Sequence, residues 1–198
     1  MKKYSLLILI LIFTLMLSTG VVAQEYGGEF TGFSSSDPKT LDPAAISSWD
    51  QAVMCMNVLE GLVRLTPKGM SIEPGIAESW SASDDGLVWT FNLREDAYFH
   101  NGENVTAQDV KYSFERVINP KTKSPSAWIF NKVVGYDAMR NGEADSVSGI
   151  TVVDDYTLEL EFVEPLPPFI SMLAAPGASV VSESAVEEYG DQFGQNVV

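Results

Sequence analysis

A β-hairpin pattern over residues 80–94 constrains the fold of this chain more than any other feature. Polar and apolar side chains alternate over residues 88–93, which is the period of a strand with one face in a core. Asp85 and Gly86 come just before this run, and this pair favours the tight turn of a two-stranded hairpin. An antiparallel sheet is therefore expected to form part of the core.

A capped helix follows this hairpin along the chain. Thr106 stands at the N-cap position, and Asp109 comes three residues later, as the acidic member of a capping box does. Apolar side chains recur at helical spacing over residues 110–118 and give the helix one buried face. Asn119 and Pro120 then end the helix, because proline cannot continue it.

A second hairpin is predicted beyond this helix, from strands at residues 150–152 and 158–162 around Asp154-Asp155. The glutamates of its second strand face away from the apolar side chains. Weaker patterns predict a strand at 28–33, a helix over 50–62 capped by Asp50, a helix at 129–141, an apolar segment at 169–175 and a helix at 183–189. Hairpins interspersed with helices indicate a mixed α/β (α+β) fold.

The charge balance narrows the classes of partner. The chain has 27 acidic and 12 basic side chains and a net charge of −15, which disfavours nucleic acids and anionic lipid surfaces. Its single cysteine, Cys55, lies in an apolar helical pattern and is predicted to be a buried small hydrophobe. With His100 the only histidine, most metal sites are excluded. A carboxylate-only metal site stays open, although no spacing supports one. No cofactor is expected.

Catalytic motifs are missing from the sequence. It contains no Gly-x-Ser-x-Gly elbow and no phosphate-binding loop of the P-loop or dinucleotide type. The paired carboxylates Asp84-Asp85 and Asp154-Asp155 are adjacent residues at predicted turns, and turn chemistry explains such pairs better than a matched acid and base does. We therefore expect a protein that is not an enzyme, and we assign no catalytic residue.

The N-terminus has the layout of a secretory signal peptide. Lys2 and Lys3 precede an apolar run over residues 6–17, and small residues before a cleavage point after about Ala23 complete the pattern. The run is too short to span a bilayer comfortably, although an uncleaved N-terminal anchor is the alternative. No cysteine follows for lipid attachment. The sequence thus predicts export to a periplasmic or extracellular location.

Four tryptophans divide into two kinds. Trp80 and Trp89 lie in the predicted hairpin, where packing accounts for both. Trp49 and Trp128 lie in loop-like, serine-rich stretches, where a core explains an aromatic side chain less readily. Aromatic side chains beside hydroxyl groups are typical of a cleft that binds a small organic ligand.

Several motifs, in order, resemble the family 5 extracellular solute-binding proteins, the oligopeptide, dipeptide and nickel receptors of ABC importers. The similarity covers essentially all residues after the predicted signal peptide. The motifs are Leu41-Asp42-Pro43, Leu59-Glu60-Gly61-Leu62, Pro74-Gly75-Ile76-Ala77-Glu78-Ser79-Trp80, Ser83-Asp84-Asp85-Gly86, Trp89-Thr90-Phe91-Asn92-Leu93-Arg94, Phe99-His100-Asn101-Gly102, residues 106–116, Asp154-Asp155-Tyr156-Thr157-Leu158 and Glu164-Pro165.

This resemblance implies a substrate-binding subunit that takes up peptides and docks on the permease subunits of an ABC importer. It also implies a two-lobed, type II periplasmic-binding-protein fold that is monomeric when complete. Family members are typically more than twice as long, so the resemblance implies that this chain corresponds to the first lobe and a small extra domain, with the second lobe absent. The expected division is a signal peptide (1–23), lobe I (24–72), the extra domain (73–175) and a return toward lobe I (176–198).

The resemblance also implies candidate ligand contacts. Ser47, Ser48 and Trp49 match the segment whose backbone runs beside a bound peptide, where an added strand would give sequence-tolerant affinity. Ser126 and Trp128 match a second stretch that lines the cleft, although some family members carry an aromatic residue at the position of Ser126. No metal ligand is implied. An oligosaccharide or a nickel complex as ligand, and a secreted interaction or chaperone-like module, are the alternatives.

Overall fold

The computed structural model describes residues 37–66, 68–69 and 71–198. The predicted signal peptide and the strand predicted at residues 28–33 lie outside them. In the described part of the chain, no helix is both long enough and apolar enough to cross a bilayer. The described residues belong to one compact unit that covers residues 34–198. The boundaries predicted at residues 72 and 175 stay predictions.

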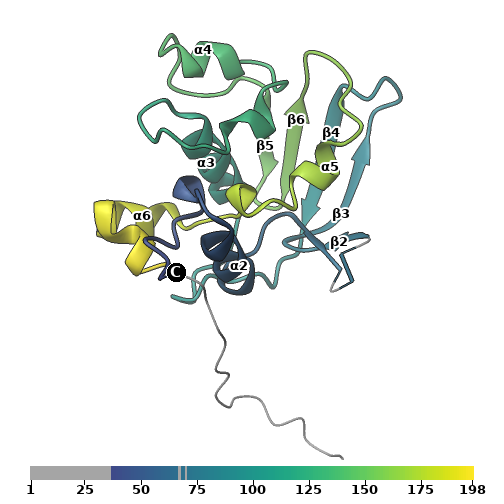
Figure 1. Ribbon diagram of the computed structural model, residues 1–198. Helices are drawn as coiled ribbons and strands as arrows, with labels where there is room; N and C mark the ends of the chain where they lie inside the picture. Colours follow the sequence, from purple (N-terminus) through teal and green to yellow (C-terminus); the bar gives the residue numbers. More distant parts are fainter. Residues whose placement is uncertain (1–36, 67, 70) are drawn as a thin grey trace, which may run out of the picture. The chain divides into compact units, whose positions relative to one another are not determined.

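Short helices and antiparallel strands alternate along these residues (Figure 1). In chain order they are η1 (Pro43–Ala45), α2 (Trp49–Val58), β1 (Val63–Leu65), β2 (Ile72–Pro74), β3 (Ala77–Ala82), β4 (Val88–Leu93), α3 (Ala107–Ile118), η2 (Ala127–Phe130), α4 (Tyr136–Arg140), β5 (Ile150–Asp154), β6 (Thr157–Glu161), α5 (Phe169–Met172), η3 (Pro176–Ala178), α6 (Glu183–Tyr189) and η4 (Gly190–Gln195), where η denotes a 3-10 helix. The mixed α/β class predicted from the sequence is confirmed.

A four-stranded antiparallel sheet in the order β3-β4-β6-β5 forms the centre of the fold. Phe91 of β4 lies opposite Leu158 of β6, and both side chains are fully buried on one face. On the other face Thr90 lies opposite Glu159, and its hydroxyl donates to the carboxylate at 3.3 Å. Both predicted hairpins are therefore confirmed, including the direction in which their side chains alternate.

Helix α3 covers the apolar face of this sheet and contacts β5 and β6. The predicted capping box is present, because the backbone N–H of Thr106 donates to Asp109 Oδ2 at 2.9 Å. Phe114, fully buried, packs its ring against that of Phe130 at a centroid distance of 4.5 Å. This ring pair joins α3 to η2, so the loop that carries Trp128 is fixed to the core.

The helix predicted over residues 129–141 is wrong. Only α4 and the end of η2 are helical there, and Gly135 between them has a left-handed φ of +87°. Val133 forms an antiparallel bridge with Phe162, and the N–H of Val134 donates to Glu161 O at 2.9 Å. The backbone of this segment is thus paired with the end of β6, which a helix would prevent.

The helix predicted over residues 50–62 is shorter than expected and is capped by Ser48 instead of Asp50. It ends at Val58, because the chain beyond it pairs with other strands. The carbonyl group of Leu62 accepts N–H groups from Gly75 and Ala77, and β1 forms a two-stranded antiparallel sheet with β2. This small hairpin was not predicted. The predicted helix over residues 183–189 is present as α6.

Candidate functional site

The first predicted ligand segment, Ser47-Ser48-Trp49, leads into helix α2. The backbone of Ser48 is extended, and its Oγ accepts the N–H of Gln51. In return Gln51 Oε1 accepts the N–H groups of Ser47 at 2.9 Å and Ser48 at 3.1 Å. Both N–H groups therefore already have a hydrogen-bond partner within the chain.

Trp49 is strongly exposed, with 77% of its surface accessible. Val53 and Met56, four and seven residues further along α2, are also exposed. This spacing places the three side chains on one face of the helix. The helix buries Cys55 on its other side, so the exposed face carries apolar side chains that the described core does not use.

The second predicted segment forms η2. Its inner side chains Ala127, Ile129 and Phe130 are buried, whereas Trp128 points outward and is 55% exposed. Ser126 is half-buried, and its N–H donates to the Oγ of Ser124 at 3.2 Å. The sequence expectation that Trp49 and Trp128 lie outside the core is confirmed. Trp80 and Trp89 pack against the core, as predicted.

The 3-10 turn η3 lies beside the second predicted segment. Gly177 of η3 is so close to Ser126 that a Cβ atom on the glycine would lie 2.1 Å from Ser126 Oγ. The same turn contacts η1 and α2, which flank Ser47 and Ser48. The structure thus places Ser126 beside η3, which also contacts α2, and each predicted segment carries an exposed tryptophan.

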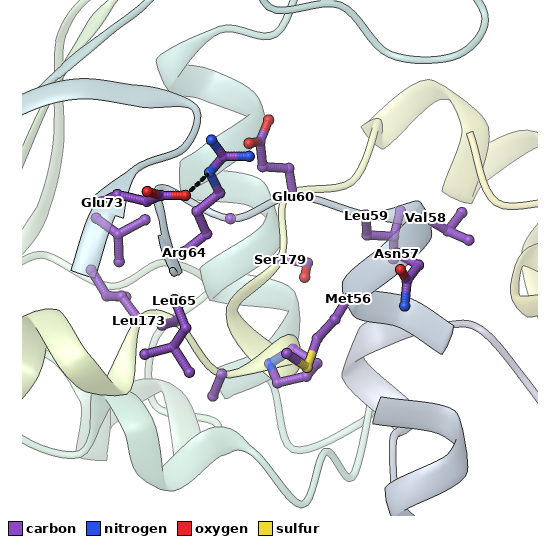
Figure 2. Close-up of a pocket in the computed structure, with 15 residues that line it drawn as sticks. Met56, Asn57, Val58, Leu59, Glu60, Arg64, Leu65, Glu73, Leu173 and Ser179 are labelled. Carbon is purple, nitrogen blue, oxygen red and sulfur yellow. Dashed lines mark ion pairs between the residues drawn. The ribbon is translucent and has the colours of Figure 1, made fainter. Parts of the chain in front are cut away.

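Two grooves among the described residues are lined by none of the five predicted site residues. The larger groove, of about 550 Å³, lies at the opposite end of α2 from Trp49. Figure 2 shows Met56 and Leu59 on one side of it and the ion pair of Arg64 with Glu73 on the other, with an N–O distance of 3.0 Å. Its remaining lining comes from Asn57, Val58, Glu60, Gly61, Val63, Leu65, Leu173, Ala174, Ala175, Pro176 and Ser179.

Sequence reasoning missed this larger groove because its walls come from three separate stretches of chain. One local signal was present: Arg64 and Glu73 carry opposite charges on either side of the turn at Lys68-Gly69, as partners across a hairpin do. A smaller groove of about 160 Å³ includes His100 and the pair of Arg94 with Glu60, whose closest N–O distance is 2.6 Å.

The carboxylates at the two predicted turns accept hydrogen bonds from neighbouring residues. Asp85 accepts the hydroxyl of Ser83 and the N–H of Leu87, and these bonds lower its pKa, with that of Ser83 the stronger cause. Asp154 accepts the N–H of Tyr156 in the second turn. Turn chemistry therefore explains the paired carboxylates, as predicted. Among the described residues, no three His, Cys, Asp or Glu side chains converge where they could hold a metal ion.

Cys55 is the buried small hydrophobe that its sequence context predicts. Its Sγ donates to the carbonyl group of Leu41 at 3.3 Å. Burial, assisted by the negative charge of Asp42, raises the pKa of the thiol to about 11. The thiolate form is therefore suppressed at neutral pH, and Cys55 does not supply a nucleophile.

Comparison with known proteins gives one consistent family. The sequence profile described as "Bacterial extracellular solute-binding proteins, family 5 Middle" matches residues 71–198. The periplasmic oligopeptide-binding protein OppA of Escherichia coli (strain K12) is 36% identical over 165 residues, which are 82% of this chain and 30% of the relative. The periplasmic murein peptide-binding protein MppA of the same organism is 38% identical over 155 residues, which are 76% of this chain and 28% of that protein.

Solved structures agree with the sequence matches. The crystal structure of Haemophilus influenzae OppA in complex with RPPGFSPFR has a TM-score of 0.76 and 30% identity, covering 80% of this chain and 31% of that one. The murein tripeptide-binding protein MppA in its unliganded open form has a TM-score of 0.73 and 36% identity, covering 79% and 30%. This chain therefore spans about a third of the length of the relatives it matches.

Proposed function

Because this chain belongs to the bacterial extracellular solute-binding proteins of family 5, we propose that the protein captures peptides outside the cytoplasm as the receptor of an ABC importer. The family is one of binding proteins. The relatives above are named for oligopeptides and murein peptides, which favours a peptide over the oligosaccharide or nickel complex that the same fold could hold. The proposal includes export with cleavage after about Ala23, a monomeric state and no catalytic activity.

The observation that supports this proposal is the exposure of Trp49 and Trp128 to solvent. Both tryptophans are exposed and offer aromatic surface that the described core does not need. Such surface packs well against peptide side chains and peptide planes. Ser47, Ser48 and Ser126 beside them belong to the same candidate surface.

The test is binding by the protein expressed from its complete gene. Isothermal titration with RPPGFSPFR and with a randomised pentapeptide library is expected to show saturable binding. Small-angle scattering is expected to show compaction on binding, because two-lobed receptors close around their ligands. An oligosaccharide library and Ni²⁺ are the competing probes. Binding of either one without any response to peptides would overturn the assignment.

Two variants locate the site. Replacing Trp49 or Trp128 by alanine is expected to weaken peptide binding by about tenfold or more, because buried tryptophan contacts are common hot spots. Tyr98→Ala is the matched control, since Tyr98 is an equally exposed aromatic residue (61%) on the edge of the smaller groove. Loss of binding in the control with retention in both tryptophan variants would move the site to that groove.

A measurement of self-association distinguishes the proposed monomeric receptor from the alternative, an interaction or chaperone-like module. Sedimentation velocity over a wide range of protein concentration is expected to give a single monomeric species. A concentration-dependent oligomer that binds no peptide would favour the module instead.

A further inference from the structure

An arginine–carboxylate pair holds the start of the described chain against helix α3. Arg116 donates from Nη1 to Asp42 Oδ1 at 2.7 Å and from Nη2 to Asp42 Oδ2 at 2.5 Å. Two parallel hydrogen bonds of this kind fix orientation as well as distance. Both side chains are largely buried. Burial alone would lower the pKa of Arg116, but the hydrogen bond and charge of Asp42 outweigh it and raise the pKa.

A third stretch of chain completes this arrangement. The guanidinium of Arg116 lies 5.6 Å from the ring centroid of Phe193, which is buried in η4. The N–H of Leu41 donates to the carbonyl group of Gly194 at 2.8 Å. Residues 41–42, 116 and 193–194 are far apart in the sequence and meet at this one point, which we call the Asp42 latch.

The latch lies directly upstream of the segment Ser47-Ser48-Trp49. Asp42 Oδ1 also accepts the N–H of Ala44 at 3.0 Å and so begins η1, whose Ala44 is fully buried in the core. Downstream, the bonds of Gln51 fix the other end of the segment. The few residues between these two anchors therefore have little freedom, although Trp49 itself is open to solvent.

We propose that Asp42 and Arg116 are positioning residues that order the segment Ser47-Ser48-Trp49 before a ligand arrives. This inference rests on the proposed function, since it assigns the pair a role at the same site. The pair acts through the backbone of the segment and not through contact with the ligand. A segment that is already ordered loses less conformational entropy on binding, and affinity rises accordingly.

The competing explanation is an ordinary structural ion pair. In that case its loss lowers the unfolding temperature but leaves affinity unchanged well below that temperature. Under our proposal the segment leaves its binding-competent form when the latch is broken. If only about a tenth of the molecules keep that form, the apparent Kd rises about tenfold.

The variants are Asp42→Asn and Arg116→Gln. Arg116→Lys is the conservative change, since it keeps the positive charge but cannot form the bidentate pair of hydrogen bonds. Glu60→Gln is the matched control. It breaks another arginine–carboxylate pair, with Arg94 at 2.6 Å, at the opposite end of α2 and removes the same charge as Asp42→Asn. All four are made in the protein expressed from its complete gene.

Hydrogen–deuterium exchange without ligand is the first measurement. We expect exchange over residues 46–49 to accelerate at least about tenfold in Asp42→Asn and Arg116→Gln, less in Arg116→Lys, and not in Glu60→Gln. The second measurement is the Kd for RPPGFSPFR and the pentapeptide library at 10 °C, where the same order of effects is expected. Unchanged exchange, or faster exchange with unchanged Kd, would overturn the positioning role. If the unmodified protein binds neither probe, the proposed function fails, and the exchange measurement alone decides on the latch.

Discussion

Gly135 and Gly142 give a sharp test of the packing around helix α4, because both have a positive φ angle but only Gly135 is surrounded closely by other atoms. Both have positive φ angles, +87° and +74°, so alanine at either site adopts a left-handed conformation. A Cβ atom on Gly142 meets nothing within 4 Å. On Gly135 it would lie 2.7 Å from the backbone nitrogen of Ser148 and 2.6 Å from its Oγ.

The expected costs follow from these contacts. Gly142→Ala should lower the free energy of unfolding by about 1 kcal/mol, the cost of placing alanine in the left-handed region. Gly135→Ala carries the same term and must also displace the backbone at Ser148, which costs about 1–3 kcal/mol for overpacking. The neighbouring N–H of Gly149 donates to Val134 O at 2.8 Å, and loss of this bond adds about 1 kcal/mol. The total for Gly135→Ala is about 3–5 kcal/mol.

Urea unfolding followed by circular dichroism measures both variants against the unmodified protein. The difference between them, about 2–4 kcal/mol, contains the steric cost and the lost hydrogen bond, because the backbone term is common to both. Equal destabilisation within about 0.5 kcal/mol would refute the reasoning that Ser148 limits the space at Gly135.

The half-buried carboxyl group of Glu115 and the buried thiol of Cys55 give two further predictions. Glu115 accepts the buried N–H of Val147 at 2.8 Å. Glu115→Gln keeps an acceptor and should change the free energy of unfolding by less than about 0.5 kcal/mol. Glu115→Ala leaves the N–H without a partner and should lower that free energy by about 1–3 kcal/mol. Burial raises the pKa of Glu115 above 4.5, so the stability it contributes is present below that pH and is lost as pH rises through the folded-state pKa. The Gln variant should lack this dependence in urea titrations from pH 4 to 7, and an identical pH profile would contradict it. Cys55, with its pKa raised to about 11, should react with a thiol reagent at pH 8 only as fast as the protein unfolds, and immediate stoichiometric labelling would show that the thiol is accessible.

The parts of the fold that could be predicted are those held by neighbours in sequence. The capping box of Thr106 and Asp109 spans three residues, and the turn at Asp85 closes a hairpin of adjacent strands. Side-chain alternation then assigned the faces of β4 and β6 correctly, since period and burial are coupled in any half-buried strand. These signals need no knowledge of the rest of the chain.

The failed predictions have two different causes. Residues 133–134 carry a helical pattern but pair with the end of β6, which lies almost 30 positions further along the chain. The cap at Ser48 was overlooked although its partner Gln51 lies only three residues on, at the same spacing as Asp109 after Thr106. The predicted site was only partly assembled by sequence reasoning as well. The motif match pointed to Ser126, but its close neighbour Gly177 lies 51 positions further along the chain and carries no local signal of its own.

The Asp42 latch joins two of the family motifs by direct hydrogen bonds. Leu41-Asp42-Pro43 and the end of the helix motif at Arg116 read as separate signatures in the sequence, 74 residues apart. In the structure they are two halves of one contact, and the rest of each motif caps or ends a helix around it. A short motif that merely terminates a helix can take many sequences, whereas a buried bidentate pair requires both partners in register. Removal of one partner leaves the other charge buried without compensation, so a change in either motif requires a matching change in the other. Under our proposal the same ion pair orders the segment that carries the exposed Trp49.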